Sequence, residues 1–134
     1  MYLIYNLLLI IVFILFVLPY YTYRLFTEKG FSRRFRQSLG RVHNKEIEKV
    51  MRKDCIWIHG ASVGEIVATS PLVKQIRQEM PDRPILVSAF TVGGYNMAKQ
   101  IIPEADAIIF FPLDLPFVAE SMVKRIHPGI FMPV

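Results

Sequence analysis

The sequence predicts an α/β fold in which an amino-terminal transmembrane helix precedes an incomplete Rossmann-like parallel sheet. Three observations predict it. The first 23 residues form one apolar run. Beyond residue 53, short apolar runs alternate with segments of helical spacing, which is the pattern of right-handed βαβ units. The short runs are apolar throughout, as is typical of parallel strands that helices cover on both faces.

Composition excludes several classes of protein and site. The chain has 134 residues, of which 53% are hydrophobic and 20% charged, so a long disordered chain is excluded. Cys55 is the only cysteine, which excludes an intramolecular disulfide framework and a cysteine-cluster zinc site. His43, His59 and His127 are not spaced like metal ligands, and we expect no metal site.

The apolar run over residues 1–23 is long enough to cross a hydrocarbon core of about 30 Å as a helix. Tyr20, Tyr21 and Tyr23 stand where an aromatic belt would lie. A secretory signal peptide is the competing interpretation, but the run lacks a basic start and a small-residue cleavage site. A buried core helix fits less well because the run is apolar on all sides. We therefore expect a retained, single-pass anchor.

The charge balance changes abruptly after the anchor. Residues 24–53 contain ten Lys or Arg against three Glu, whereas residues 54–134 contain six against eight acidic residues. By the positive-inside rule, the basic segment and the rest of the chain are expected to be cytoplasmic. The expected divisions are an anchor over 1–23, a basic juxtamembrane segment over 24–53 and a sheet domain over 54–134.

Within the basic segment, Phe31, Phe35 and Leu39 recur at helical spacing and predict a short amphipathic helix with these residues on one face. The alternatives for its positive charge are a surface that binds phosphorylated lipid and a solvated topology signal. Nucleic-acid binding is not expected, because the anchor holds this patch against a membrane. The candidates to hold lipid headgroups are three arginines: Arg33, Arg34 and Arg36.

The elements of the sheet domain follow in order. Strands are expected at Cys55–His59, Pro84–Phe90, Asp106–Phe111 and from Gly129 onward. Helices are expected at Glu65–Met80, Gly93–Ile102 and Leu115–Ile126. Pro71 should kink the first of these helices or mark the first turn of its main part. Because ligands of parallel sheets lie beyond the carboxyl ends of the strands, the loops after the first three strands are the candidate site.

The loop after the first strand permits two chemistries. Gly60, Ser62 and Gly64 fit the G-x-S-x-G pattern of a nucleophile elbow, with Asp114 and His127 following in triad order. This would make the chain a membrane-anchored serine hydrolase. The pattern is short, however, and His127 precedes a strand, which places it at the opposite edge of the sheet from Ser62.

The other chemistry uses Glu65 as a general base on a hydroxyl group. Glu65 falls in the first helical turn, where the helix dipole stabilises its carboxylate. Gly64 would let another molecule approach the backbone closely. The structural alternative is a glutamate that only caps its helix.

The next two loops carry weaker signals. Thr91 and the free backbone N–H groups at Gly93 and Gly94 could hold a phosphate or sugar oxygen at a helix start, although a plain tight turn fits equally well. Asp114 is expected to be the N-cap of the helix that follows it. Cys55 lies in a strand and is expected to be inert core.

These residues, in this order, resemble the 3-deoxy-D-manno-octulosonic acid (Kdo) transferases. The resemblance rests on the anchor, on Lys29-Gly30 and Leu39-Gly40 in the basic segment, and on the block from Trp57 to Glu65. Three later segments continue the match: Pro84-Ile-Leu-Val, Thr91-x-x-Gly94 and Pro112-Leu-Asp-Leu-Pro116.

The resemblance implies the amino-terminal domain of a two-domain GT-B glycosyltransferase, with its globular part on the cytoplasmic face of the inner membrane. Such an enzyme transfers Kdo from CMP-Kdo to a lipid A precursor in lipopolysaccharide synthesis and needs no other cofactor. The family's proposed base falls on Glu65. The loop residues expected to contact the acceptor are Ser62, Gly64, Thr91 and Gly94.

Two departures from the family pattern qualify this expectation. The family usually has Thr just before the Gly of the second loop, where this chain has Gly93. The chain also stops within the expected fourth strand, before a Glu-x-Glu-x-Trp-Pro-Asn block and the donor domain. We therefore expect a fragment that is inactive alone. The remaining alternatives are the serine hydrolase and a non-catalytic module that binds anionic lipid.

Overall fold

The computed structural model describes residues 2–27 and 30–134. Glu28 and Lys29 of the basic segment lie outside the described residues. The Lys29-Gly30 pair is therefore described only at Gly30. The chain divides into two compact units, residues 1–32 and residues 33–134, and each is described by itself.

The first unit is helical. Helix α1 (Tyr2–Val12), the π-helical turn η1 (Phe13–Val17) and helix α2 (Leu18–Thr27) follow one another without a break. The π turn lies just ahead of Pro19, where the Leu18 N–H bonds to the Phe13 carbonyl five residues back. Proline inside a helix removes an N–H donor and crowds the preceding turn of the helix. A π-helical turn at that point relieves the crowding. Within this unit, Ile4–Tyr23 is long and apolar enough to cross a membrane, with a mean hydropathy of 2.3.

The second unit contains a four-stranded parallel sheet in the order β3-β2-β1-β4. Its strands are β1 (Ile56–Gly60), β2 (Ile85–Ala89), β3 (Ala107–Phe110) and β4 (Ile130–Pro133). Strand β1 pairs in parallel with β2 and with β4, with Ile56 opposite Ile85 and Ile130. The predicted α/β class and the parallel sheet are confirmed.

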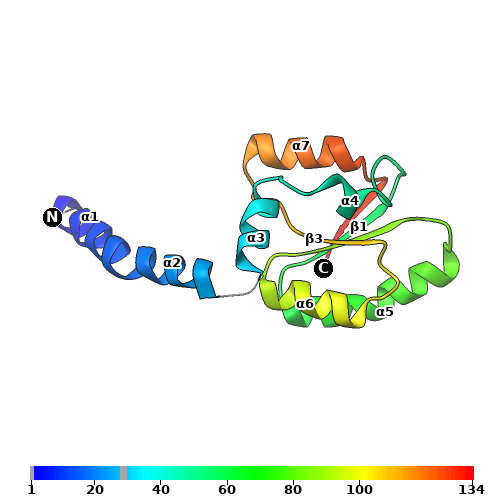
Figure 1. Ribbon diagram of the computed structural model, residues 1–134, viewed down its shortest axis with the longest axis horizontal. Coiled ribbons are helices and arrows are strands. Elements are labelled where there is room, and N and C mark those ends of the chain that lie inside the picture. Colours follow the sequence, from blue (N-terminus) through cyan, green and yellow to red (C-terminus); the bar gives the residue numbers. More distant parts are fainter. Residues whose placement is uncertain (1, 28–29) are drawn as a thin grey trace. The chain divides into compact units, whose positions relative to one another are not determined.

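Helices cover both faces of this sheet (Figure 1). Helices α5 (Val63–Glu79) and α6 (Val92–Ile101) lie on one face, and α4 (Asn44–Ile47) and α7 (Pro116–Ile126) on the other. Because each crossover joins parallel strands, α5 and α6 both begin at the carboxyl edge of the sheet. The candidate site therefore lies at that edge.

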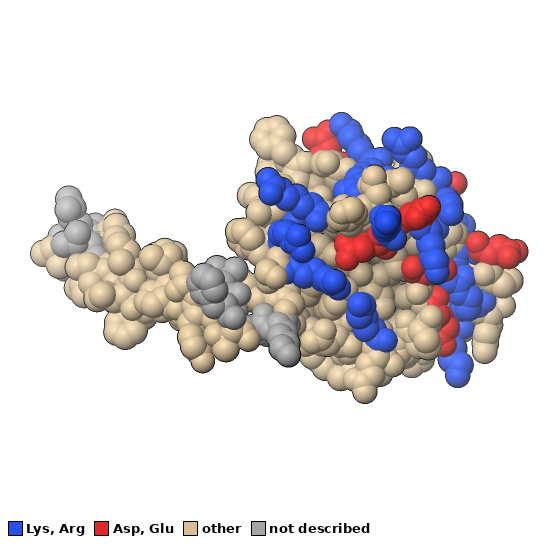
Figure 2. All heavy atoms as spheres, viewed as in Figure 1, with Lys and Arg blue, Asp and Glu red and all other residues tan. Residues whose placement is uncertain are grey.

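Part of the basic segment belongs to the sheet unit, which begins at Arg33 and not at residue 54 as the charge pattern indicated. Helix α3 (Phe31–Ser38) forms as predicted. Its residues Gln37 and Ser38 are buried, whereas Phe35 is 53% exposed. The buried Gln37 side chain accepts a hydrogen bond from the Phe110 N–H of β3 at 2.9 Å, which fastens α3 to the sheet. Basic side chains gather on the face where α3 and α4 lie (Figure 2).

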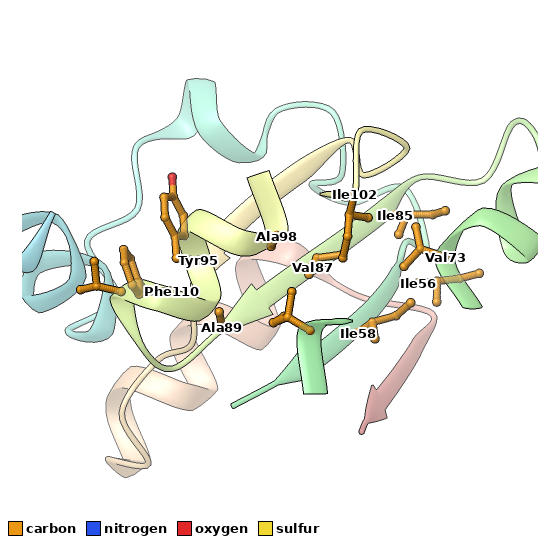
Figure 3. Packing of buried hydrophobic residues seen from close by; sticks show 12 residues of the cluster. Ile56, Ile58, Val73, Ile85, Val87, Ala89, Tyr95, Ala98, Ile102 and Phe110 are labelled. Carbon is orange, nitrogen blue, oxygen red and sulfur yellow. The ribbon is translucent and has the colours of Figure 1, made fainter. Parts of the chain in front are cut away.

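The core has two parts, one on each face of the sheet, because successive strand residues point to opposite sides. Ile56 and Ile58 of β1 pack toward α5 and α6, together with residues of β2 and α6 (Figure 3). Trp57 faces the opposite side, toward Met122 and Ile126 of α7. The Trp57 indole N–H donates to the Ser88 hydroxyl at 2.8 Å, so both buried polar groups are satisfied.

One local prediction is wrong, and one of two alternatives at a second position is excluded. Asp114 is not the N-cap of α7: Leu115 occupies that position, because Pro116 fills the first helical position, where its missing N–H costs nothing. Of the two roles predicted for Pro71, it does not mark the first turn of a helix, since α5 is a single helix from Val63 to Glu79 with Pro71 inside it. Burial of one face of α5 in the core outweighs the single hydrogen bond that Pro71 removes.

Candidate functional site

The loop between β1 and α5 holds Glu65 in a capping box. Ser62 is the N-cap of α5, and its hydroxyl accepts from the Glu65 N–H at 3.4 Å. In return, Glu65 Oε2 accepts from the Ala61 N–H at 2.5 Å and from the Ser62 N–H at 3.4 Å. The carboxylate is thereby fixed at the carboxyl end of β1.

These bonds keep Glu65 ionised. The hydrogen bond from the Ala61 N–H is the main cause that lowers the pKa of Glu65 below its ordinary value, and the Ser62 groups and the neighbouring His59 add to it. Both bonds go to Oε2, and no hydrogen bond to Oε1 is found within residues 2–27 and 30–134. The backbone N–H groups that cap the helix thus bond to one of the two carboxylate oxygens.

His59 stands beside this carboxylate at the end of β1. Its Nδ1 lies 3.2 Å from the Ser88 carbonyl oxygen and 3.1 Å from the Ser88 hydroxyl, and its ring stacks on Phe111 at 3.9 Å. Burial lowers the pKa of His59, so the ring is neutral at neutral pH. A carbonyl oxygen only accepts, which favours a proton on Nδ1 and leaves Nε2 as an acceptor.

Sequence reasoning considered His59 only as a metal ligand. The available signal was its position as the one ionisable residue inside a buried strand, next to the glycine that opens the candidate loop. The His59 ring is neutral, stacks on Phe111 and is bonded through Nδ1 to Ser88. A ring held in this way is suited to orient a polar group beside Glu65.

The second loop lies against the first. Thr91 is the N-cap of α6, and its hydroxyl accepts from the Gly94 N–H at 3.0 Å. A Cβ on Gly93 would lie 3.2 Å from Val63 at the start of α5, which shows how closely the two helix starts approach. The structure thus brings together two of the three loops that were predicted to form the candidate site.

The glycines of these loops differ in their surroundings. Gly94 is buried, and a Cβ there would lie 3.1 Å from the Thr91 hydroxyl and 3.3 Å from Ala89 Cβ. A Cβ on Gly64 would meet only the Ser62 hydroxyl, at 4.0 Å. Gly94 thus occupies a tightly packed position, whereas a side chain at Gly64 would meet no close neighbour.

Two of the candidate arginines reach the same edge of the sheet. Arg33 donates to the Tyr95 hydroxyl at 3.1 Å, and this bond is the main cause that raises the pKa of Arg33. The Arg34 guanidinium lies 4.9 Å from the centre of the Phe90 ring, at the end of β2. Arg36 is exposed on the same helix. Helix α3 therefore adds positive charge beside the Thr91 loop.

The groups of a serine hydrolase do not assemble. The Ser62 hydroxyl caps α5, and His127 lies 3.6 Å from Asp54, which precedes β1 at the amino edge of the sheet. His127 and Ser62 are thus at opposite ends of the strands, as the sequence indicated. Burial raises the pKa of Cys55 to about 11, so this thiol is protonated core. Within the described ranges, no group of three metal-ligating side chains is found.

A family model described as 3-deoxy-D-manno-octulosonic-acid transferase (kdotransferase) matches residues 33–134, the whole of the sheet unit. The chain belongs to the Kdo transferase family. The matched region begins where the compact unit begins, which supports the inclusion of α3 in that unit.

Curated relatives agree with this family. The chain is 37% identical over 75 residues to the 3-deoxy-D-manno-octulosonic acid transferase of Haemophilus influenzae and 37% over 76 residues to that of Chlamydia muridarum. Each alignment covers 56% of this chain and 18% of the relative. The corresponding Rickettsia felis protein is 30% identical over 97 residues, 71% of this chain and 21% of that protein. No solved structure gives a significant match.

Proposed function

We propose that this chain forms the acceptor-binding part of a glycosyltransferase that moves Kdo from CMP-Kdo to a lipid A precursor. The observation that carries the proposal is the Glu65 carboxylate, fixed in ionised form at the carboxyl edge of a parallel sheet. In a two-domain GT-B arrangement, the donor nucleotide would be bound by a second domain that lies outside these residues.

In this reaction, Glu65 acts as general base on an acceptor hydroxyl. The hydroxyl oxygen forms a bond to the anomeric carbon of Kdo while the bond from that carbon to the phosphate oxygen of CMP breaks. The proton passes to Glu65, and CMP leaves with the electron pair. The free oxygen Oε1 is the atom suited to take the proton, because Oε2 is held by the Ala61 N–H.

The acceptor is proposed to lie over the two helix starts. Ser62 and Gly64 border Glu65, and Thr91 and Gly94 form the neighbouring start of α6. We propose that Gly94 acts by shaping this loop, since a Cβ there would meet Ala89. The positive charge that would attract the anionic headgroup comes from three arginines: Arg33, Arg34 and Arg36.

We also propose that the first unit anchors the protein in the inner membrane, with the sheet unit on the cytoplasmic side. The helix over Ile4–Tyr23 has the length and hydropathy for one crossing. The positive charge that follows it favours retention on the cytoplasmic side.

The substitution Glu65→Gln tests the proposed base. Glutamine keeps a side-chain acceptor for the Ala61 N–H, so the capping box and the fold should persist. Loss of the base should lower the rate of Kdo transfer by about 10²- to 10⁴-fold. The measurement is transfer from CMP-Kdo to lipid A precursor by protein expressed from the complete open reading frame.

The matched control is Glu79→Gln, which removes a carboxylate from the far end of the same helix and should leave transfer unchanged. A Glu65→Gln protein that transfers Kdo at the normal rate would exclude Glu65 as the base. Acceptor binding without any transfer by the unsubstituted protein would instead indicate a lipid-binding module.

A further inference from the structure

A hollow of about 390 Å³ lies between α3 and α4, away from the loop that holds Glu65. Most of its walls are cationic: Arg33 and Arg36 come from α3, Arg41 from the connection and Lys45 from α4. Glu46 is the one carboxylate among its described lining residues. Four cations and one carboxylate leave the hollow with a formal charge of +3.

The backbone brings these cations together. Gly40 ends α3 in a left-handed conformation, with φ of 77°, and its N–H bonds to the Gln37 carbonyl at 2.9 Å. The next N–H, of Arg41, bonds back to the Arg36 carbonyl at 3.0 Å. This pair of bonds is a Schellman motif, which turns the chain back on the end of its helix. It places Arg41 beside Arg36.

One of the four cations, Arg33, is bonded inside the protein, to the Tyr95 hydroxyl, whereas the side chains of the other three bond to no described residue. Within the described residues, the side chains of Arg36, Arg41 and Lys45 make no hydrogen bond and no ion pair. Glu46, by contrast, accepts from the Gln37 amide at 2.8 Å and from the His43 N–H at 3.3 Å. Like charges gathered in this way repel one another, so an anion in the hollow would lower their energy.

Contacts with α7 and with the core hold the backbone that forms the hollow. Arg125 of α7 donates to the Val42 carbonyl and to the Asn44 side chain, on either side of His43. Val42 and Ile47 are buried in the core under α4. A ligand that enters the hollow would therefore meet donors on a rigid backbone, which lowers the entropic cost of binding.

We propose that this hollow is a binding site for a phosphate monoester. Two arginines offer forked pairs of N–H donors that match two phosphate oxygens each, and Lys45 adds a point charge. A wall charge of +3 favours a dianion over a monoanion. The phosphate can belong to a lipid headgroup or to a free metabolite, since both present the same group. The site shares Arg33 and Arg36 with the charge proposed above to attract the acceptor headgroup, and in that respect it rests on the proposed function.

The test measures binding without any sugar donor, so its outcome is independent of the transfer reaction. The full chain, in nanodiscs of phosphatidylcholine, is titrated by calorimetry with phenyl phosphate and with phenyl sulfate. Phenyl sulfate has a similar shape and one negative charge less. We expect phenyl phosphate to bind at least about tenfold more tightly.

The double variant Arg36→Gln/Arg41→Gln should weaken phenyl phosphate binding by about tenfold or more, because two charge-assisted contacts are lost. Both side chains are exposed and bond to no described residue, so the fold should persist. The control pair Lys74→Gln/Lys124→Gln lowers the net charge equally on other helices and should keep full affinity. As a second readout, the side-chain N–H resonances of Arg36 and Arg41 should shift when phenyl phosphate binds.

The source of the phosphate is distinguished by replacing part of the phosphatidylcholine with phosphatidic acid. Competition with phenyl phosphate would assign the site to a lipid headgroup, and unchanged phenyl phosphate binding would assign it to a soluble monoester. The proposal is overturned if the unsubstituted chain does not bind phenyl phosphate, if phenyl sulfate binds equally well, or if the control pair loses as much affinity as the arginine pair.

Discussion

At Glu65, the observed capping bonds and the proposed proton transfer would use different atoms of one carboxylate. The residue pattern left two interpretations open, a base and a helix cap, and the structure shows that the capping contacts exist. They occupy Oε2 and lower the pKa of the group, which keeps it ionised but makes it a weaker base. Capping is thus compatible with catalysis, because it orients the carboxylate that would accept the proton.

A second prediction at the residue scale concerns Gly94. Gly94→Ala should destabilise the protein by about 1–3 kcal/mol, because the added methyl group would press against the Thr91 hydroxyl and Ala89 Cβ in a packed position. Chemical denaturation of the full chain in detergent micelles measures this. Gly64→Ala is the control and should be nearly neutral, since its Cβ would meet only the Ser62 hydroxyl. Equal stability of the two variants would contradict this account of the loop.

Among the elements, helix starts decide the geometry of the site. Helices α5 and α6 begin with Ser62 and Thr91 as N-caps, which each accept from an N–H three residues on. The sequence predicted both helices and their place at the carboxyl edge. It did not predict the Leu115 N-cap of α7, because Asp114 is the better capping residue and only the position of Pro116 decides against it.

The capping box makes a prediction about pH. Folding lowers the pKa of Glu65 from its ordinary value of 4.5, so its stabilising contribution is present above that value. The contribution is lost as the pH falls through the lower pKa of the folded state. Glu65→Gln should therefore flatten the loss of unfolding free energy with acidification below pH 4.5, as measured by denaturation at a series of pH values. Parallel curves for the two proteins would show that the capping bonds do not favour the ionised form.

In the whole molecule, the charge pattern and the fold divide the chain differently. Charge separates residues 24–53 from the rest, whereas packing joins residues from Arg33 onward to the sheet. The joining contacts are the Gln37 bond to Phe110 and the burial of Val42, Ile47 and Val50. The arginines of α3 are thus positioned by the domain that carries Glu65.

The attachment of α3 to the sheet through Gln37 predicts the effect of Gln37→Met. The Phe110 N–H would lose its buried acceptor, and an unsatisfied buried donor costs about 1–3 kcal/mol. The unfolding free energy of the full chain should fall by that amount. Gln78→Met on the exposed side of α5 is the matched control and should change stability little. If the two variants are equally stable, α3 is not an integral part of the sheet unit.

The sequence by itself determined the α/β class, the parallel strands and the loops at their carboxyl ends, because burial on both faces imposes continuous apolar runs. It also placed Glu65 and Thr91 at helix starts, since loop glycines and capping residues are local signals. Only the tertiary structure decided that α3 belongs to the domain, that His59 stands beside Glu65, and that Arg36, Arg41 and Lys45 share one hollow. These groups are brought together by packing between segments that are distant in the sequence. Residue spacing along the chain does not indicate which distant segments pack together.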